Sequence, residues 1–178
     1  MQLDAAKTKT ERARIAKESG VKGLPALSCV GPLDYTRSIP WEWFHLLLEN
    51  VIPNLVDLWT GNFKGLDIGR EGYQIAPHIW EAIGMETASA VQHIPASFVH
   101  VLGNIACDQS YFTAESWCFW FLYLAPKLLD NRFPKKKYYS HMCELVEIMK
   151  IMLQFTIMAS SINDIEGRLI NWVQKYEK

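Results

Sequence analysis

The run Trp117–Ala125 limits the fold more than any other feature of the sequence, because all nine of its residues are apolar. In a helix these residues would be apolar on every face, and such a helix is stable only when other elements surround it. Nine residues are far too few to cross a bilayer, which needs about 20. The sequence therefore predicts a central helix that is buried all round. Thr113 is placed to cap it, and Pro126 should kink or end it.

Apolar residues at spacings of three and four predict further helices on either side of this run. One stripe covers residues 44–58 and contains Pro53, which we expect to kink or break the helix. A second apolar segment covers residues 136–156. A last helix would be capped by Ser160 or Ser161. Its inward-facing residues are predicted to be Ile162, Ile165, Leu169, Trp172 and Val173.

Strand signals are nearly absent, because no alternating run of β-branched residues is longer than about four. The expected fold is therefore all-α, an irregular helical bundle of five or six helices. The predicted core consists of Trp117, Trp120, Phe121, Leu145, Ile148, Met149 and Met152.

The distribution of charge divides the sequence more sharply than its net charge of −1 suggests. Residues 1–31 carry six basic and three acidic side chains, whereas residues 32–130 carry four basic and eleven acidic ones. We expect residues 1–40 to form a charged N-terminal helix and an irregular connector, and residues 41–178 to form a helical domain. The asymmetry is typical either of contact with a polyanion or of ordinary solvated faces.

The four cysteines include no CxxC pair, so the sequence predicts no zinc site. Their apolar surroundings favour buried, reduced thiols and an intracellular protein. Residues 1–20 have no apolar core, so a secretory signal is not expected, and no window is long enough for a membrane span.

Glu42 and His45 form the first candidate site. Residues three apart share a helix face, and a carboxylate beside an imidazole can bind a metal or act as an acid–base pair. Glu-x-x-His is also the half-site of di-iron helical bundles, which need two such motifs. This order occurs once here, since the pairs at 78–81 and 141–144 are reversed. A simple pair on a helix surface is the other interpretation.

The segment 132–139 is the second candidate, because it combines basic and aromatic residues at the start of a predicted helix. Lysines can neutralise phosphates, and tyrosines can stack on bases. The residues predicted to contact nucleic acid are Arg132, Lys135, Lys136 and Lys137. A solvated loop between helices, with its tyrosines packed inward, is the alternative.

Four segments, taken in order, resemble an interior piece of the CACTA-type DNA transposases, in the form abundant in fungal genomes. The resemblance extends from about Ala6 to Lys178. It is carried by VKGLPALS at 21–28, SIPWEWFHLLLENVIPNLVDLWTG at 38–61, SYFTAESW at 110–117 and RFPKKKYYSH at 132–141.

The resemblance implies a helical insertion in an RNase-H-like DDE catalytic domain, which cuts and rejoins DNA with two Mg²⁺ or Mn²⁺ ions. The family's Asp-x-x-His motif corresponds to Glu42 and His45, with glutamate in place of aspartate. The family's first aspartate would lie upstream of this region, and its last glutamate would lie beyond Lys178. The resemblance therefore implies a catalytically incomplete fragment that holds no cofactor itself.

The same resemblance implies a nuclear protein whose partners are DNA and the rest of the transposase, without contact to a membrane. Self-association is also expected, because such a fragment exposes apolar surface. A non-catalytic helical module, which binds DNA or protein and derives from a transposon, is the alternative function. A carboxylate-bridged di-metal bundle is the third.

Overall fold

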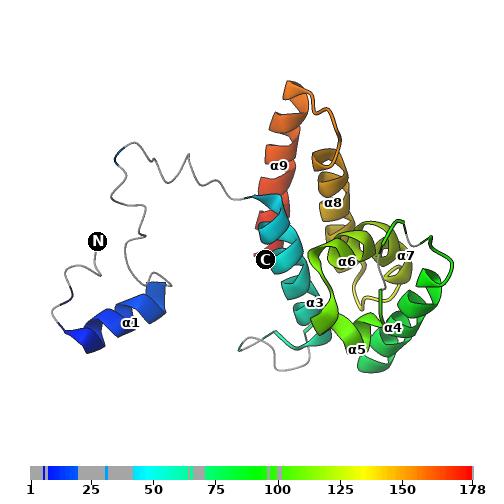
Figure 1. Ribbon diagram of the computed structural model, residues 1–178, viewed down its shortest axis with the longest axis horizontal. Helices are drawn as coiled ribbons and strands as arrows, with labels where there is room; N and C mark the ends of the chain where they lie inside the picture. Colours follow the sequence, from blue (N-terminus) through cyan, green and yellow to red (C-terminus); the bar gives the residue numbers. More distant parts are fainter. Residues whose placement is uncertain are drawn as a thin grey trace. The chain divides into compact units, whose positions relative to one another are not determined.

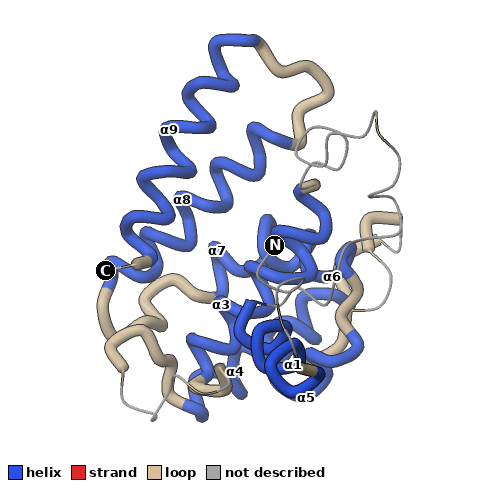
Figure 2. The backbone as a smooth tube through the Cα atoms, turned by 90° about the vertical axis from the view of Figure 1, so that its left-hand side faces the viewer, coloured by secondary structure: helices blue, strands red, loops and turns tan. Residues whose placement is uncertain are grey.

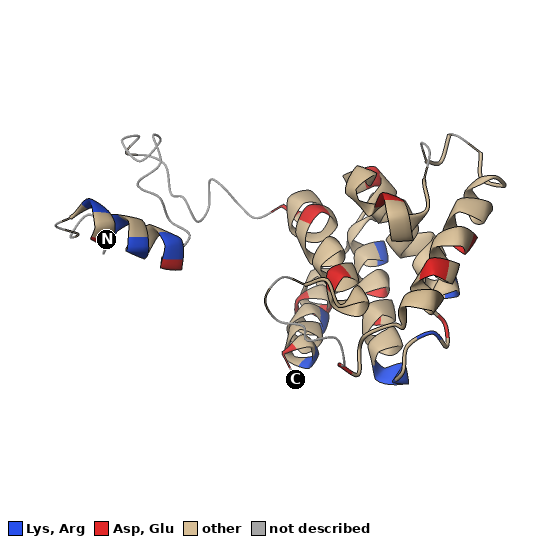
Figure 3. Ribbon diagram, turned by 90° about the horizontal axis from the view of Figure 1, so that it is seen from below, with Lys and Arg blue, Asp and Glu red and all other residues tan. Residues whose placement is uncertain are grey.

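A computed structural model describes residues 6, 8–19, 31, 42–63, 65, 71–95, 97–99 and 102–177. The chain divides into two units, Met1–Trp41 and Glu42–Lys178, and each is described by itself. In the first unit, α1 spans Lys9–Ser19 and carries Lys and Arg along its length (Figure 3). Arg14 pairs with Glu18 one turn further on, at 2.7 Å.

The second unit is built from helices alone in the part that the structure describes (Figure 1 and Figure 2). These are η2 (Phe44–Val51), α3 (Ile52–Thr60), α4 (Pro77–Val91), α5 (Ile105–Asp108), η3 (Gln109–Tyr111), α6 (Ala114–Phe119), η4 (Trp120–Leu124), α7 (Ala125–Leu128), α8 (Lys136–Met152) and α9 (Ala159–Tyr176). Several of these adjoin, so the described residues of the two units contain seven helical segments, of which the shortest combines α5 and η3. The predicted all-α fold is confirmed.

Two of these helices contain a proline beyond their first turn and continue past it. A proline ring normally collides with the carbonyl group four residues earlier. For Pro53 and Pro126 that carbonyl belongs to a π-helical stretch, η2 or η4, in which each turn holds an extra residue. The wider turn moves the carbonyl away from the ring. Pro53 therefore does not break its helix, which continues to Thr60, and α7 continues for two residues after Pro126.

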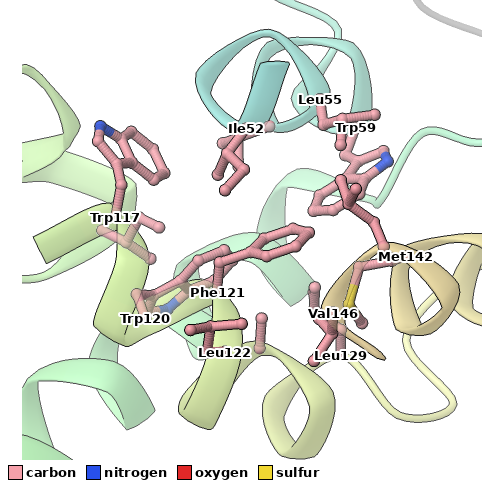
Figure 4. Packing of buried hydrophobic residues seen from close by; sticks show 14 of the residues in the cluster. Ile52, Leu55, Trp59, Trp117, Trp120, Phe121, Leu122, Leu129, Met142 and Val146 are labelled. Carbon is pink, nitrogen blue, oxygen red and sulfur yellow. The ribbon is translucent and has the colours of Figure 1, made fainter. Parts of the chain in front are cut away.

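The helix Ala114–Leu128 occupies the centre of the second unit. Thr113 caps it by accepting a hydrogen bond from the Ser116 N–H, as predicted. Trp120 and Phe121 are completely buried, and the Phe121 ring points toward side chains of α3 and α8 (Figure 4). However, Tyr123 is 61% exposed, so this helix is not buried all round. The neighbouring helices do not cover every face of this helix, and an apolar residue on the uncovered face is exposed to solvent.

The predicted core is confirmed for Trp117, Trp120, Phe121, Leu145, Ile148 and Met149, which are all buried, while Met152 is half-buried at the edge of the core. Two further positions in the core come from segments for which no burial was predicted. Phe133 is buried in the loop after α7, where its ring meets Trp59 edge to face at 5.3 Å. Gly84 of α4 lies so close to Asn104, the capping residue of α5, that any side chain there would collide with it.

Helices α8 and α9 lie side by side as a hairpin (Figure 1 and Figure 2). Helix α8 ends at Met152, four residues earlier than predicted, because Leu153 has left the helical conformation. Helix α9 begins at Ala159 after Met158, without a side-chain cap, so the predicted serine cap is wrong. Of the residues predicted to face inward, Trp172 is buried and Ile165 and Leu169 are half-buried, but Ile162 and Val173 are exposed. A single neighbouring helix covers only part of a broad apolar stripe.

One buried polar contact joins α4 to the central helix. The Trp120 indole Nε1–H donates to Thr87 Oγ1 at 3.1 Å, and the Thr87 hydroxyl donates to the Ile83 carbonyl at 2.8 Å. Both residues are fully buried, so neither group can turn to water instead. An unpaired buried donor is unfavourable by about 1–3 kcal/mol. Thr87 therefore allows the large Trp120 side chain to lie in the centre of the core.

We predict that Thr87→Val lowers the free energy of unfolding by about 1–3 kcal/mol, because it leaves the Trp120 N–H without a partner. Urea denaturation followed by circular dichroism measures the change. Thr60→Val is the matched control, since the Thr60 hydroxyl also donates to a carbonyl of its own helix, at 2.9 Å, but supports no indole. In a Trp120→Phe background Thr87→Val should be clearly less destabilising. Equal effects in both backgrounds would show that the indole contact is unimportant.

Candidate functional site

Glu42 and His45 lie at the start of η2, and the structure brings them together. Glu42 Oε2 accepts the Phe44 N–H at 2.8 Å, and Oε1 accepts the His45 N–H, also at 2.8 Å. The His45 ring approaches the same Oε1 atom through Nδ1. Glu42 thus accepts from two of the four N–H groups that a helix leaves unpaired in its first turn. The observed contacts are those of a helix cap.

The electrostatics of Glu42 agree with this role. Its hydrogen bond from the His45 backbone N–H is the main cause that lowers the pKa of the carboxyl group below its usual value. On the other side of the imidazole, Glu49 Oε2 lies 3.8 Å from His45 Nε2. All three side chains are about half or more exposed, which weakens any charge interaction among them. His45 is therefore held between two carboxylates on an open helix surface.

These residues do not fit a two-metal catalytic centre. Such a centre needs several carboxylates around a pair of ions. Within the described ranges, no group of three or more His, Cys, Asp or Glu side chains is placed to hold a metal ion. His141 and Glu144 form the reversed pair on α8, and here Glu144 already makes an ion pair with Lys175 at 2.6 Å. The Glu42 oxygens are committed to the backbone of η2.

The basic residues of segment 132–139 differ in how they are held. Arg132 Nη2 lies 2.8 Å from Glu86 Oε1 and ties the loop to α4. Lys135, Lys136 and Lys137 are exposed, and none of them pairs with a carboxylate of the described residues. They stand at the start of α8, whose first turn contains no acidic residue. Positive charge is unfavourable at a helix N-terminus, so an anion bound there would be stabilised.

The tyrosines of this segment pack inward, as the loop interpretation predicts. The Tyr139 hydroxyl donates to the Pro126 carbonyl at 2.8 Å, and burial raises the pKa of this tyrosine to about 12. Tyr138 is half-buried, with its ring 5.8 Å from that of Tyr73, and the Lys137 ammonium lies 4.8 Å from the Tyr138 ring centre. Stacking on bases is therefore not supported for these two rings. Contact with a nucleic acid here would be through lysine and phosphate.

A groove that no sequence pattern indicated lies between α8 and α9. It has a volume of about 400 Å³ and is lined by side chains of both helices, among them Tyr139, Cys143, Glu147 and Arg168. Burial raises the pKa of the Cys143 thiol, so this thiol is not activated as a nucleophile. The expectation of buried cysteines is wrong for Cys107, which is exposed, and Cys29 lies outside the described residues.

Comparison of the chain with protein-family models, curated proteins and solved structures gives no match. Among the described residues, no helix is both long enough and apolar enough to span a membrane.

His141, from the second reversed pair, joins α8 to α9 by reciprocal bonds. Its ring stacks on Trp172 at 4.4 Å, with the ring planes 10° apart. The Trp172 Nε1–H donates to the His141 carbonyl at 2.9 Å, and His141 Nε2 lies 3.0 Å from the Trp172 carbonyl. A carbonyl only accepts, so the proton of the neutral ring is on Nε2. Burial is the main cause that lowers the pKa of His141. The Trp172 carbonyl and Glu144 act in the opposite direction and raise this pKa, but by less.

We predict that the second unit becomes less stable as the pH falls below about 6.5, the usual pKa of histidine. Because the pKa of His141 is lowered in the folded chain, the imidazole binds a proton more readily in the unfolded chain. The contribution of neutral His141 to stability is therefore present above this pH and is lost as the pH falls below it. The measurement is the urea midpoint at about pH 7.5 and 5.5. His141→Phe keeps an aromatic ring on Trp172 but cannot titrate, so its midpoint should change less between the two pH values. An equal change in both proteins would contradict the assignment to His141.

Proposed function

We propose that the chain is a helical segment of a CACTA-type DNA transposase, which contacts the DNA backbone but does not itself cut DNA. The observation that carries the proposal is the state of Glu42, the acidic residue at the position of the family's motif. Its carboxylate caps η2, and the described residues around it do not form a metal clamp. An all-α fold agrees with the helical insertion that the resemblance implies. On this proposal the protein acts in the nucleus, together with the rest of the transposase.

The three lysines at the start of α8 provide the proposed DNA contact. They are exposed, adjacent in sequence and without an acidic neighbour in the first turn of the helix. A lysine that neutralises a phosphate releases condensed counterions, and this contribution is independent of DNA sequence. Arg132 has a structural role instead, because its ion pair with Glu86 holds the loop against α4. We therefore expect binding without base recognition.

We predict that changing Lys135, Lys136 and Lys137 together to alanine weakens binding to unrelated duplexes by similar factors. The slope of log K against log salt should become shallower by up to about 3, since each phosphate contact contributes about 0.9. Fluorescence anisotropy at several salt concentrations measures both effects. The control changes Lys127, Lys150 and Lys175 to alanine, which removes the same charge elsewhere. Equal losses in both triple variants would contradict a local contact, and an unchanged affinity would mean that the loop is only a solvated turn.

A further prediction is that the chain neither nicks nor joins a supercoiled plasmid in Mg²⁺ or Mn²⁺. A two-metal mechanism needs carboxylates on both ions, and Glu42 is directed to the backbone of η2 instead. Agarose electrophoresis of the plasmid measures nicking, with Glu42→Ala as the matched control. Metal-dependent nicking that disappears in the control would overturn this part of the proposal.

A non-catalytic helical module that binds protein is the second candidate. It is favoured by the apolar side chains that are exposed between α8 and α9, among them Phe155 and Met158. This candidate would be favoured over the first if both triple lysine variants kept the DNA affinity of the unchanged chain and if the chain associated with a protein through these apolar side chains.

A further inference from the structure

The closed end of the α8–α9 hairpin is an exposed surface that the proposed DNA contact does not use. We call residues 153–162 the hairpin tip. The tip projects beyond the other helices of the second unit (Figure 1 and Figure 2). The sequence from Ile151 to Asn163 contains no charged residue. A solvated loop between two helices is usually polar, so an uncharged apolar tip requires a different explanation.

The tip exposes about as much apolar surface as the largest patch on a typical soluble monomer. Its five large apolar residues and their exposed fractions are Phe155 (111%), Met158 (71%), Ile162 (58%), Leu153 (40%) and Ile157 (36%). A large side chain has roughly 200 Å² of surface, so the tip exposes roughly 600 Å². This equals the largest patch that is typical of a monomer, and such patches commonly mark interaction sites.

The nearest charged residue on either side of the tip, Lys150 on α8 and Asp164 on α9, is already paired within the chain. Lys150 Nζ lies 2.9 Å from Glu147 on α8, and Arg168 Nε lies 2.8 Å from Asp164 on α9. Two identical surfaces that meet about a two-fold axis bring each charge near its own copy, which is unfavourable for an excess of one sign. The hairpin tip has no such excess.

We propose that the hairpin tip is the surface through which two copies of the chain associate about a two-fold axis. Contact between two tips buries roughly 1,200 Å² in total, which reaches the lower end of the range for specific protein interfaces. A lipid surface is a poorer partner, because helices that lie on membranes combine apolar residues with an excess of Lys and Arg. This inference does not depend on the transposase proposal.

The test is analytical ultracentrifugation of the full chain over a range of concentrations. We expect a dimer at about 50 μM that dissociates on dilution. Phe155→Asp should raise the dissociation constant at least about 30-fold, because two buried like charges then meet at the interface. Phe98→Asp is the matched control, since Phe98 is 66% exposed outside the tip and its substitution should change nothing. Circular dichroism verifies that both variants are folded.

A mixing experiment separates contact between two tips from contact of a tip with another surface. Phe155→Asp and Phe155→Lys should each be monomeric alone, while their equimolar mixture should form a dimer, because opposite charges then face each other. Three results would overturn the proposal: a monomer at every concentration, a dimer that Phe155→Asp leaves unchanged, or a mixture that stays monomeric. Binding of the monomer to phosphatidylcholine vesicles, lost in Phe155→Asp, would assign the tip to a lipid surface instead.

Discussion

The hydrogen bond between the Trp120 indole and Thr87 is the constraint on which the packing of the second unit depends. Trp120 fills the space between α4 and the central helix, and its ring meets Trp80 and Trp117 edge to face at 6.1 and 6.3 Å. Such a residue can be completely buried only where its N–H finds an acceptor. The Thr87 hydroxyl on α4 is this acceptor. The bond therefore sets the position of α4 along the central helix.

The second requirement concerns the backbone. Two of the helices that line the core contain a proline beyond their first turn, and in both a π-helical stretch precedes the proline. The uninterrupted helix Phe44–Thr60 places Ile52 and Trp59 against the same core as Trp120 (Figure 4). The wider turns of η2 and η4 are thus a local adaptation that allows a rigid residue inside a packed bundle.

The candidate functional residues were found by spacing, but their roles depend on neighbours that spacing does not show. Glu42 and His45 are three apart and do meet, as the helical period requires. The Glu42 carboxylate also lies next to free N–H groups of the helix that it precedes. These contacts favour a role of Glu42 as a helix cap over a role as a metal ligand. In segment 132–139 the basic residues looked equivalent in sequence, yet Arg132 is paired with Glu86 across 46 residues of chain and the lysines are exposed.

The sequence by itself determined the all-α class, the capping of the central helix by Thr113 and the burial of six of the seven residues predicted for the core, because helical periodicity and capping are local properties. It did not determine that Tyr123, Ile162 and Val173 face solvent, since apolar character sets only which residues can be buried. Which of them are buried depends on how many helices pack around each one. The tertiary structure alone decided the partners of Trp120, Arg132 and His141, because these contacts join segments more than 30 residues apart. No pattern within one helix contains that information.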